Sequence, residues 1–174
     1  GKDFDCSGCS GLKSLNGAPK KVGGDFVCSG CPKLKSLDGA PKEVGEDFWS
    51  TECTKLTSLE GTPEKVKGFY CYDCPNLTSL EGAPKEAVDD FSCSSCRKLT
   101  SLKGAPEKVS RNFNCSNCEN LTSLVGAPKE VGMYWLETRD IMPASKEEIV
   151  EAQEDGVSIN CGWGPKEIVV ENGK

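Results

Sequence analysis

The sequence predicts a repeat solenoid, in which short coils stack side by side around one continuous core. The first observation is a pattern, represented by residues 26–47, that recurs six times with a period of 22 residues and one step of 21. The repeats begin at Phe4, Phe26, Phe48, Phe69, Phe91 and Phe113. The second observation is that apolar residues within a repeat follow the spacing of a short strand and then of a turn. The third is a Gly-Ala-Pro corner, such as residues 39–41, where Gly permits a turn and Pro prevents a helix from continuing.

The second repeat illustrates what each coil contributes to the core. Phe26 and Cys28 are two positions apart, so on a strand both side chains point to the same face, toward the interior. Leu34 and Leu37 are three positions apart, which suits a tight arc or a 3₁₀-like turn on the convex side. Val44 returns to the core before the next strand. Because neighbouring coils must stack to bury these side chains, we expect no single repeat to fold alone.

This pattern resembles the leucine-rich repeat family, in its cysteine-containing form. The resemblance rests on V-G-E-D-F-x-C/S-x-x-C followed by L-x-S-L, as in residues 44–59, with Cys31, Cys53 and Cys74 at the position where the family usually has Asn or Cys. The motif L-T-S-L-E-G-A-P is also similar to the short repeats found in arrays in bacterial and phage proteins. Over residues 1–132 the resemblance implies a leucine-rich-repeat-like solenoid of six coils, with a parallel β-sheet on one face and irregular or 3₁₀ turns on the other. Members of this family mostly bind other proteins.

Eleven of the twelve cysteines belong to the repeat, and they allow two interpretations. The favoured one is a ladder of buried structural thiols, because Cys behaves as a small hydrophobe and because Ser50 replaces one Cys without breaking the pattern. The residues of this ladder are Cys6, Cys9, Cys28, Cys31, Cys53, Cys71, Cys74, Cys93, Cys96, Cys115 and Cys118. Like cysteines in neighbouring coils would also lie near disulfide distance, which matters only in an oxidising compartment.

The alternative interpretation is a metal site. The C-x-x-C pairs have the spacing of a zinc ribbon, and an iron–sulfur cluster would use the same ligands. The alternative ligands are Cys6, Cys9, Cys28, Cys31, Cys71, Cys74, Cys93 and Cys96. The spacing between pairs follows from the repeat period, so it is not independent evidence for a metal. Nothing in the sequence lowers the pKa of one thiol selectively, so we do not expect catalytic C-x-x-C chemistry.

The outward-facing strand positions form the candidate binding surface. Repeats three and four bring Trp49, Tyr70 and Tyr72 onto this face, where most other repeats carry small polar residues. Trp and Tyr are enriched in binding hot spots, although aromatic residues also favour strands for structural reasons alone. The predicted binding residues are Trp49, Tyr70, Tyr72, Val27, Glu52 and Asp73, and Asp47 and Asp90 complete an acidic rim around them.

Composition narrows the classes of partner. The formal net charge is −6 and no basic stretch is present, which disfavours nucleic acid. Histidine is absent, which removes the commonest general base and the commonest metal ligand. No apolar run has the length of a membrane helix, and no signal-peptide pattern is recognisable, so we expect a cytoplasmic protein without a membrane partner.

The period stops after Val131, and residues 133–174 are predicted to form a small α/β capping segment. A capping box at Ser145 and Glu148 and a stop at Gly156 predict a helix over about 145–155, followed by strands over about 157–163 and 167–171. The amino-acid sequence of residues 138–160 and 165–174 is similar to that of the pyridine-nucleotide domain of the glutamate synthase small-subunit family of flavin oxidoreductases. The family's Gly-rich loops for FAD and NADPH are missing here, and Leu136 and Glu137 stand where the family has paired Arg.

Together these patterns predict a non-catalytic solenoid that binds a protein or peptide on its strand face and needs no cofactor. The alternative is a cysteine-ligated zinc or iron–sulfur module associated with a flavin/NAD(P)H oxidoreductase.

Overall fold

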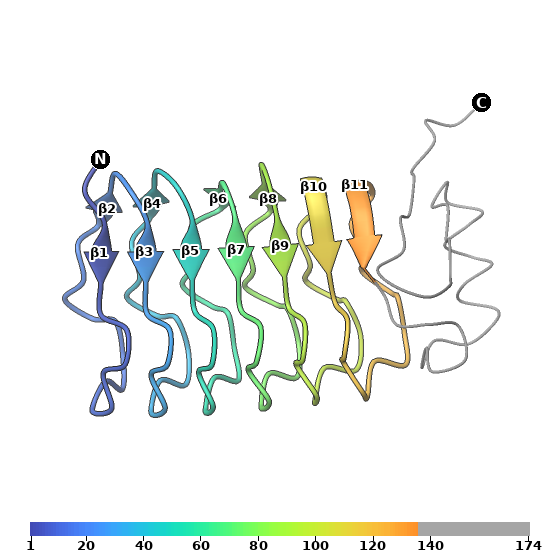
Figure 1. Cartoon of the computed structure of the whole chain (residues 1–174), viewed down its shortest axis with the longest axis horizontal. Coiled ribbons are helices and arrows are strands. Elements are labelled where there is room, and N and C mark those ends of the chain that lie inside the picture. Colours follow the sequence, from blue (N-terminus) through green and yellow to red (C-terminus); the bar gives the residue numbers. More distant parts are fainter. Residues whose placement is uncertain (136–174) are drawn as a thin grey trace.

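The structure, a computed structural model, describes residues 1–135 of the chain, with side chains placed as far as Gly132. These residues form a parallel β-solenoid of about six turns, each of roughly 22 residues, and none of the described residues is helical. The coils follow one another in a row, so that equivalent parts of successive repeats lie side by side (Figure 1).

Most coils contribute two short strands, where the sequence predicts one. The first set begins with the repeat's Phe and comprises β1 (Phe4–Asp5), β3 (Phe26–Val27), β5 (Phe48–Trp49), β7 (Phe69–Tyr70) and β9 (Phe91–Ser92). The second set precedes that Phe and comprises β2 (Lys21–Val22), β4 (Glu43–Val44), β6 (Lys65–Val66) and β8 (Glu86–Ala87). In β10 (Lys108–Asn114) the two positions merge into one longer strand. A bend separates the two strands in the earlier coils.

Neighbouring coils pair in parallel and in phase with the repeat. Phe26 pairs with Phe48, Phe48 with Phe69, and Phe69 with Phe91. Within residues 1–135 the strands form one sheet of nine strands and one of two, because β10 pairs with both β8 and β9 and so joins the two strand sets. Equivalent residues therefore form columns that run the length of the solenoid.

The core consists of these columns, and the predicted inward positions are confirmed. Stacked phenylalanines form the central column, with ring centroids 4.9–5.6 Å apart from Phe4 to Phe113. The paired leucines and the Val or Ala of each coil pack around it. Most of these side chains are completely buried, so the hydrophobic effect acts across coil boundaries rather than within a coil.

The convex side is built from tight turns rather than from 3₁₀-helices, none of which occurs in the described part of the chain. The amide of Leu34 donates to the carbonyl of Cys31 at 3.2 Å, and that of Ala40 to Leu37 at 3.0 Å. These bonds span three residues, as in a single turn. The corner glycine is required, because Gly39 has a φ of +88° and the equivalent glycines lie between +87° and +104°.

The sheet extends beyond the predicted boundary at residue 132. Strand β11 (Glu130–Trp135) pairs with β10, so that Tyr134 lies in register with Phe113. A register shift between Val109 and Asn112 accommodates one residue fewer in β11. The helix predicted over 145–155 and the strands predicted over 157–163 and 167–171 lie outside the described residues, as does the rest of the predicted cap.

Candidate functional site

The aromatic residues of coils three and four form a stacked pair on the outer face of the sheet. Trp49 in β5 and Tyr70 in β7 occupy the same position of neighbouring strands. Their ring centroids are 3.9 Å apart and their planes differ by 14°. Neither residue is fully buried, because the alternation along each strand directs the neighbouring Phe inward and these rings outward. The stack is therefore a preformed, partly exposed aromatic surface.

Gly68 makes room for the phenol of Tyr70. A Cβ atom at Gly68 would lie 2.7 Å from Cε2 of Tyr70 and 2.9 Å from its hydroxyl oxygen. Gly68 stands where most other coils carry Asp or Asn, and it lies in the coil whose period is one residue shorter. The Tyr70 hydroxyl donates to Oδ2 of Asp90 at 3.4 Å. The absence of a side chain at Gly68 and the hydrogen bond to Asp90 thus set the orientation of the Tyr70 phenol.

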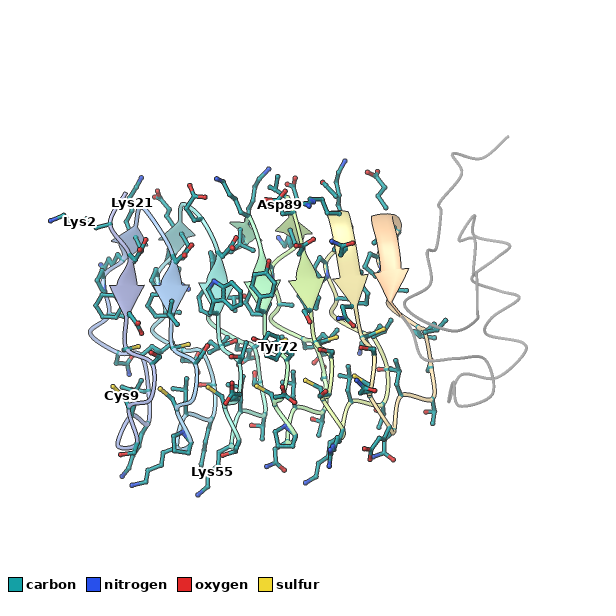
Figure 2. The ribbon with its side chains drawn as sticks, viewed as in Figure 1. Lys2, Cys9, Lys21, Lys55, Tyr72 and Asp89 are labelled. Atoms are coloured by element: carbon teal, nitrogen blue, oxygen red, sulfur yellow. The ribbon has the colours of Figure 1, made fainter. Side chains whose placement is uncertain are left out.

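Beside this stack lies an open groove of about 460 Å³. We call it the aromatic groove, and its lining residues are Trp49, Tyr70, Tyr72, Asp90, Phe91, Ser92, Ser94, Asn112 and Asn114. Three of the six predicted binding residues line it, namely Trp49, Tyr70 and Tyr72. Figure 2 labels Tyr72 near the middle of the row of coils and Asp89 toward the opposite end of the strands.

The other three predicted residues lie outside the aromatic groove. Val27 is half-buried on the strand before Trp49. Glu52 and Asp73 are exposed turn residues with φ values of 57° and 54°. Gly8 and Gly30 occupy the same turn position in the first two coils, with similar φ values of 66° and 64°. The turn conformation is therefore common to these coils, and it accounts for the positions of Glu52 and Asp73 without a bound ligand.

Sequence reasoning missed the far wall of the groove. Ser92 and Asn114 continue the column of Trp49 and Tyr70 into coils five and six. Ser92 is buried and Asn114 half-buried, and both line the groove without contributing a ring. The sequence does contain a signal for this wall, because the same position of successive repeats changes from two aromatic residues, Trp49 and Tyr70, to the smaller Ser92 and Asn114.

Asp90 lines the groove and occupies a repeat position at which the first coils also carry Asp residues. In the first coils they form a ladder, in which Oδ1 of Asp3 accepts the amide of Asp25 at 3.0 Å and Oδ1 of Asp25 accepts that of Asp47 at 3.0 Å. Burial raises the pKa of the Asp47 carboxyl, and the charge of Asp25 adds to the effect. Burial and the nearby carboxylates also raise the pKa of the Tyr70 hydroxyl, which therefore remains a neutral donor.

The second cysteine of a C-x-x-C pair makes a hydrogen bond to the preceding coil, which gives the spacing a structural explanation. The paired strand residues end at Val27 and Trp49, just before the first cysteine position. The thiol of Cys53 then donates to the carbonyl oxygen of Cys28 in the preceding coil at 3.3 Å. Cys96 and Cys118 donate in the same way to Cys71 and Cys93, at 3.3 Å and 3.2 Å. The second cysteine of each pair therefore satisfies a carbonyl oxygen of the preceding coil, beside backbone hydrogen bonds between coils that continue as far as the Gly30 amide and the Thr51 carbonyl.

Ser50 fits this arrangement, because it replaces a first-position cysteine and its carbonyl still accepts from Cys74 at 3.3 Å. Its hydroxyl donates to the carbonyl of Tyr70 at 3.4 Å, as the thiol of Cys6 does to Val27 at the same distance. A buried hydroxyl with a partner is tolerated at this position.

Burial keeps several thiols of the ladder protonated. It raises the pKa of Cys53 to about 11 and that of Cys28 well above the usual value for a thiol. Zinc requires thiolates, so a metal would have to displace these protons and the hydrogen bonds that the thiols make to carbonyl oxygens. No group of three or more His, Cys, Asp or Glu side chains that could hold a metal ion occurs among residues 1–132.

The ladder differs from the prediction in the first coil. Cys9 is exposed and Cys6 only half-buried, while the other nine repeat cysteines are buried. The described chain places no coil on the outer side of the first one, so Cys9 lacks the neighbour that covers Cys31. The prediction that Cys9 is buried is therefore wrong.

We expect a thiol-specific alkylating reagent to modify Cys9 within minutes in the native protein and Cys6 more slowly. The nine buried cysteines should react only after denaturant is added, because burial hinders access of the reagent. The test uses the Cys161→Ser chain, so that a residue outside the described range does not contribute, and reads the sites by mass spectrometry. Rapid modification of Cys53 or Cys96 in the native protein would contradict the buried ladder.

A second, larger depression of about 1050 Å³ lies along the other set of strands. Much of its lining consists of Lys and Glu side chains that pair with one another across coils. Lys65 Nζ lies 2.9 Å from Oε2 of Glu86, and Lys21 pairs with Glu43. Exposed pairs of this kind contribute little stability, and they leave Lys42 as the one charged residue of this lining without an ion pair among the described residues, so we regard the aromatic groove as the better candidate site.

Comparison with protein-family models, with curated proteins and with solved structures found no match. Among the residues that the structure describes there is also no helix long and apolar enough to cross a bilayer. The candidate functional site of this chain is therefore the aromatic groove.

Proposed function

We propose that this chain is a non-catalytic solenoid that binds a protein or peptide across its strand face, centred on the aromatic groove. The observation that carries the proposal is the partly exposed Trp49–Tyr70 stack beside an open groove. Holding large aromatic rings in a fixed, partly exposed position lowers the entropy lost on binding, which is how such residues act as hot spots.

The width of the sheet favours an extended partner over a small molecule. The groove crosses successive strands and is open to solvent, so an extended peptide would contact several coils at once. The leucine-rich-repeat character is part of the same proposal, supported by the two buried leucines and the strand in each coil.

The alternative function, a zinc or iron–sulfur module associated with a flavin oxidoreductase, has less support. Three of the thiols that would ligate the metal, those of Cys31, Cys74 and Cys96, donate hydrogen bonds to carbonyl oxygens, and burial raises the pKa of the first two. Elemental analysis and an absorbance spectrum of protein purified without oxygen test this alternative, and stoichiometric zinc or iron would favour it.

Selection of peptides from a random displayed library tests the proposed function without a known partner. The bait is the full chain, and peptides that also bind the Trp49→Ser, Tyr70→Ser, Tyr72→Ser triple variant are removed. We expect wild-type protein to enrich a set of related peptides with micromolar affinity, because the three rings supply most of the binding energy. If repeated selections yield only peptides that bind both proteins equally, the strand face of these coils is not the binding site.

A further inference from the structure

The aromatic groove contains a slot one side chain wide. The column Trp49, Tyr70, Ser92 and Asn114 has one residue per coil. Trp49 covers one face of the Tyr70 ring, and the opposite face borders the position of Ser92, which carries no ring. Adjacent strands are about 4.8 Å apart, so Tyr70 and Asn114 are separated by roughly 10 Å. A flat group stacks at about 3.5–4 Å from a ring, so one planar group fits between them.

The end of this slot carries a carboxylate with spare acceptor capacity. Oδ1 of Asp90 accepts both the backbone amide and the side-chain amide of Asn112, at 3.1 Å and 2.7 Å. From the residues that the structure describes, Oδ2 accepts only a long hydrogen bond from Tyr70, at 3.4 Å. A carboxylate oxygen can accept a further, shorter hydrogen bond from a charged donor.

Carboxylates predominate around the Tyr70 hydroxyl, and the neighbouring strand β10 adds a cation, Arg111, whose backbone amide donates to the carbonyl of Asp89. Asp47 and Asp89 also lie close enough to act on the Tyr70 hydroxyl. Over the part of the chain that the structure describes, none of the ion pairs engages Asp47 or Asp90, while the nearby Lys67 is already paired with Glu46. The slot therefore favours a planar, cationic occupant with several donors.

We propose that the slot takes the side chain of an arginine from an extended partner peptide, with its guanidinium stacked on Tyr70 and donating to Asp90. This inference rests on the proposed function and names the residue that the groove recognises. A guanidinium is flat, permanently charged and presents its donors in a plane, so it satisfies the ring face and the carboxylate together. A lysine ammonium provides the charge without the plane, and a sugar provides the stacking without the charge.

A nuclear magnetic resonance titration of the isotope-labelled full chain tests the proposal. The probe is the capped tripeptide Gly-Arg-Gly, with Gly-Lys-Gly and Gly-citrulline-Gly as matched controls. We expect saturable shifts confined to the amides of residues 70, 90, 92, 112 and 114, and at least about fivefold weaker binding of both controls, because Lys lacks the planar fork and citrulline lacks the charge. Equal affinity for all three peptides, or shifts that map elsewhere, would overturn the proposal.

Two variants with one matched control separate recognition from folding. Asp90→Asn keeps an oxygen for the Asn112 amide but removes the charge, so we expect Gly-Arg-Gly to bind at least about tenfold more weakly. Asp25→Asn makes the same change at the same ladder position away from the slot and should leave binding unchanged. Ser92→Trp places a ring in the slot, at a column position where Trp49 likewise follows an Asp two residues earlier, and should abolish the shifts while the circular dichroism spectrum is retained. If Asp25→Asn weakens binding as much as Asp90→Asn, general charge attraction explains the data and the slot does not.

Failure of this inference is distinguishable from failure of the proposed function. Selected peptides that depend on Trp49, Tyr70 and Tyr72 but contain no common arginine would retain the binding surface and reject the arginine slot. Shifts at the same amides with a neutral disaccharide, and none with Gly-Arg-Gly, would reassign the slot to a carbohydrate and also contradict the proposal. Absence of any groove-dependent peptide would contradict the proposed function itself.

Discussion

Phe48→Ala should lower the free energy of unfolding by about 3–5 kcal/mol, because it removes a large ring from a closed column. Phe48 is fully buried, and its ring centroid lies 4.9 Å from that of Phe26 and 5.3 Å from that of Phe69. Backbone hydrogen bonds of 2.9 Å hold Phe48 to Gly68 and Phe26 to Asp47, so the coils cannot close around the cavity. Urea denaturation, followed by circular dichroism and by tryptophan fluorescence, measures the loss.

Phe4→Ala is the matched control for this effect. Phe4 occupies the same column position but is only half-buried and has one ring neighbour, at 5.6 Å. We expect it to cost about 1–2 kcal/mol, in proportion to the smaller apolar area removed from the core. Equal losses in the two variants would contradict a core that depends on stacking between coils.

Gly82→Ala should cost about 2–6 kcal/mol, the sum of roughly 1–3 kcal/mol of backbone strain and roughly 1–3 kcal/mol of overpacking. Gly82 has a φ of +88°, and a Cβ atom there would lie 2.5 Å from the backbone nitrogen of Glu60 in the preceding coil. Because the obstacle is backbone, the two coils would have to separate. The same denaturation experiment measures the cost.

Gly17→Ala isolates the contribution of strain. Gly17 has a φ of +98°, but a Cβ atom there meets nothing within 4 Å. Only the strain of about 1–3 kcal/mol should remain. If Gly17→Ala is as costly as Gly82→Ala, close stacking of the corners is not what requires glycine.

The repeat architecture and its inward face could be predicted from the sequence, because both follow from periodicity. Phe26 and Cys28 lie on one side of a strand whatever the details of the turn, and they are buried as expected. The division of each coil into two strands was not predicted, since Glu43–Val44 is too short to leave a periodic signal of its own.

The candidate site was predicted only in part, because a groove forms where small side chains lie beside large ones. Trp49, Tyr70 and Tyr72 could be identified by their type, whereas Ser92 matters because it is small beside a ring. The role of the second cysteine was also hidden, because a thiol that donates to the preceding coil and a zinc ligand share the same C-x-x-C spacing. Only the position of the thiols relative to the carbonyl oxygens separates the two.

The affinity of a library-selected peptide for the wild-type chain and for the Trp49→Ser, Tyr70→Ser, Tyr72→Ser variant tests the central claim most directly. Isothermal titration calorimetry measures both values, and circular dichroism checks that the variant remains folded, as we expect because other coils carry small residues at these positions. The binding surface proposed here predicts a loss of more than about 2 kcal/mol, or roughly 30-fold in affinity, in a folded variant. Unchanged affinity in the folded variant would contradict it.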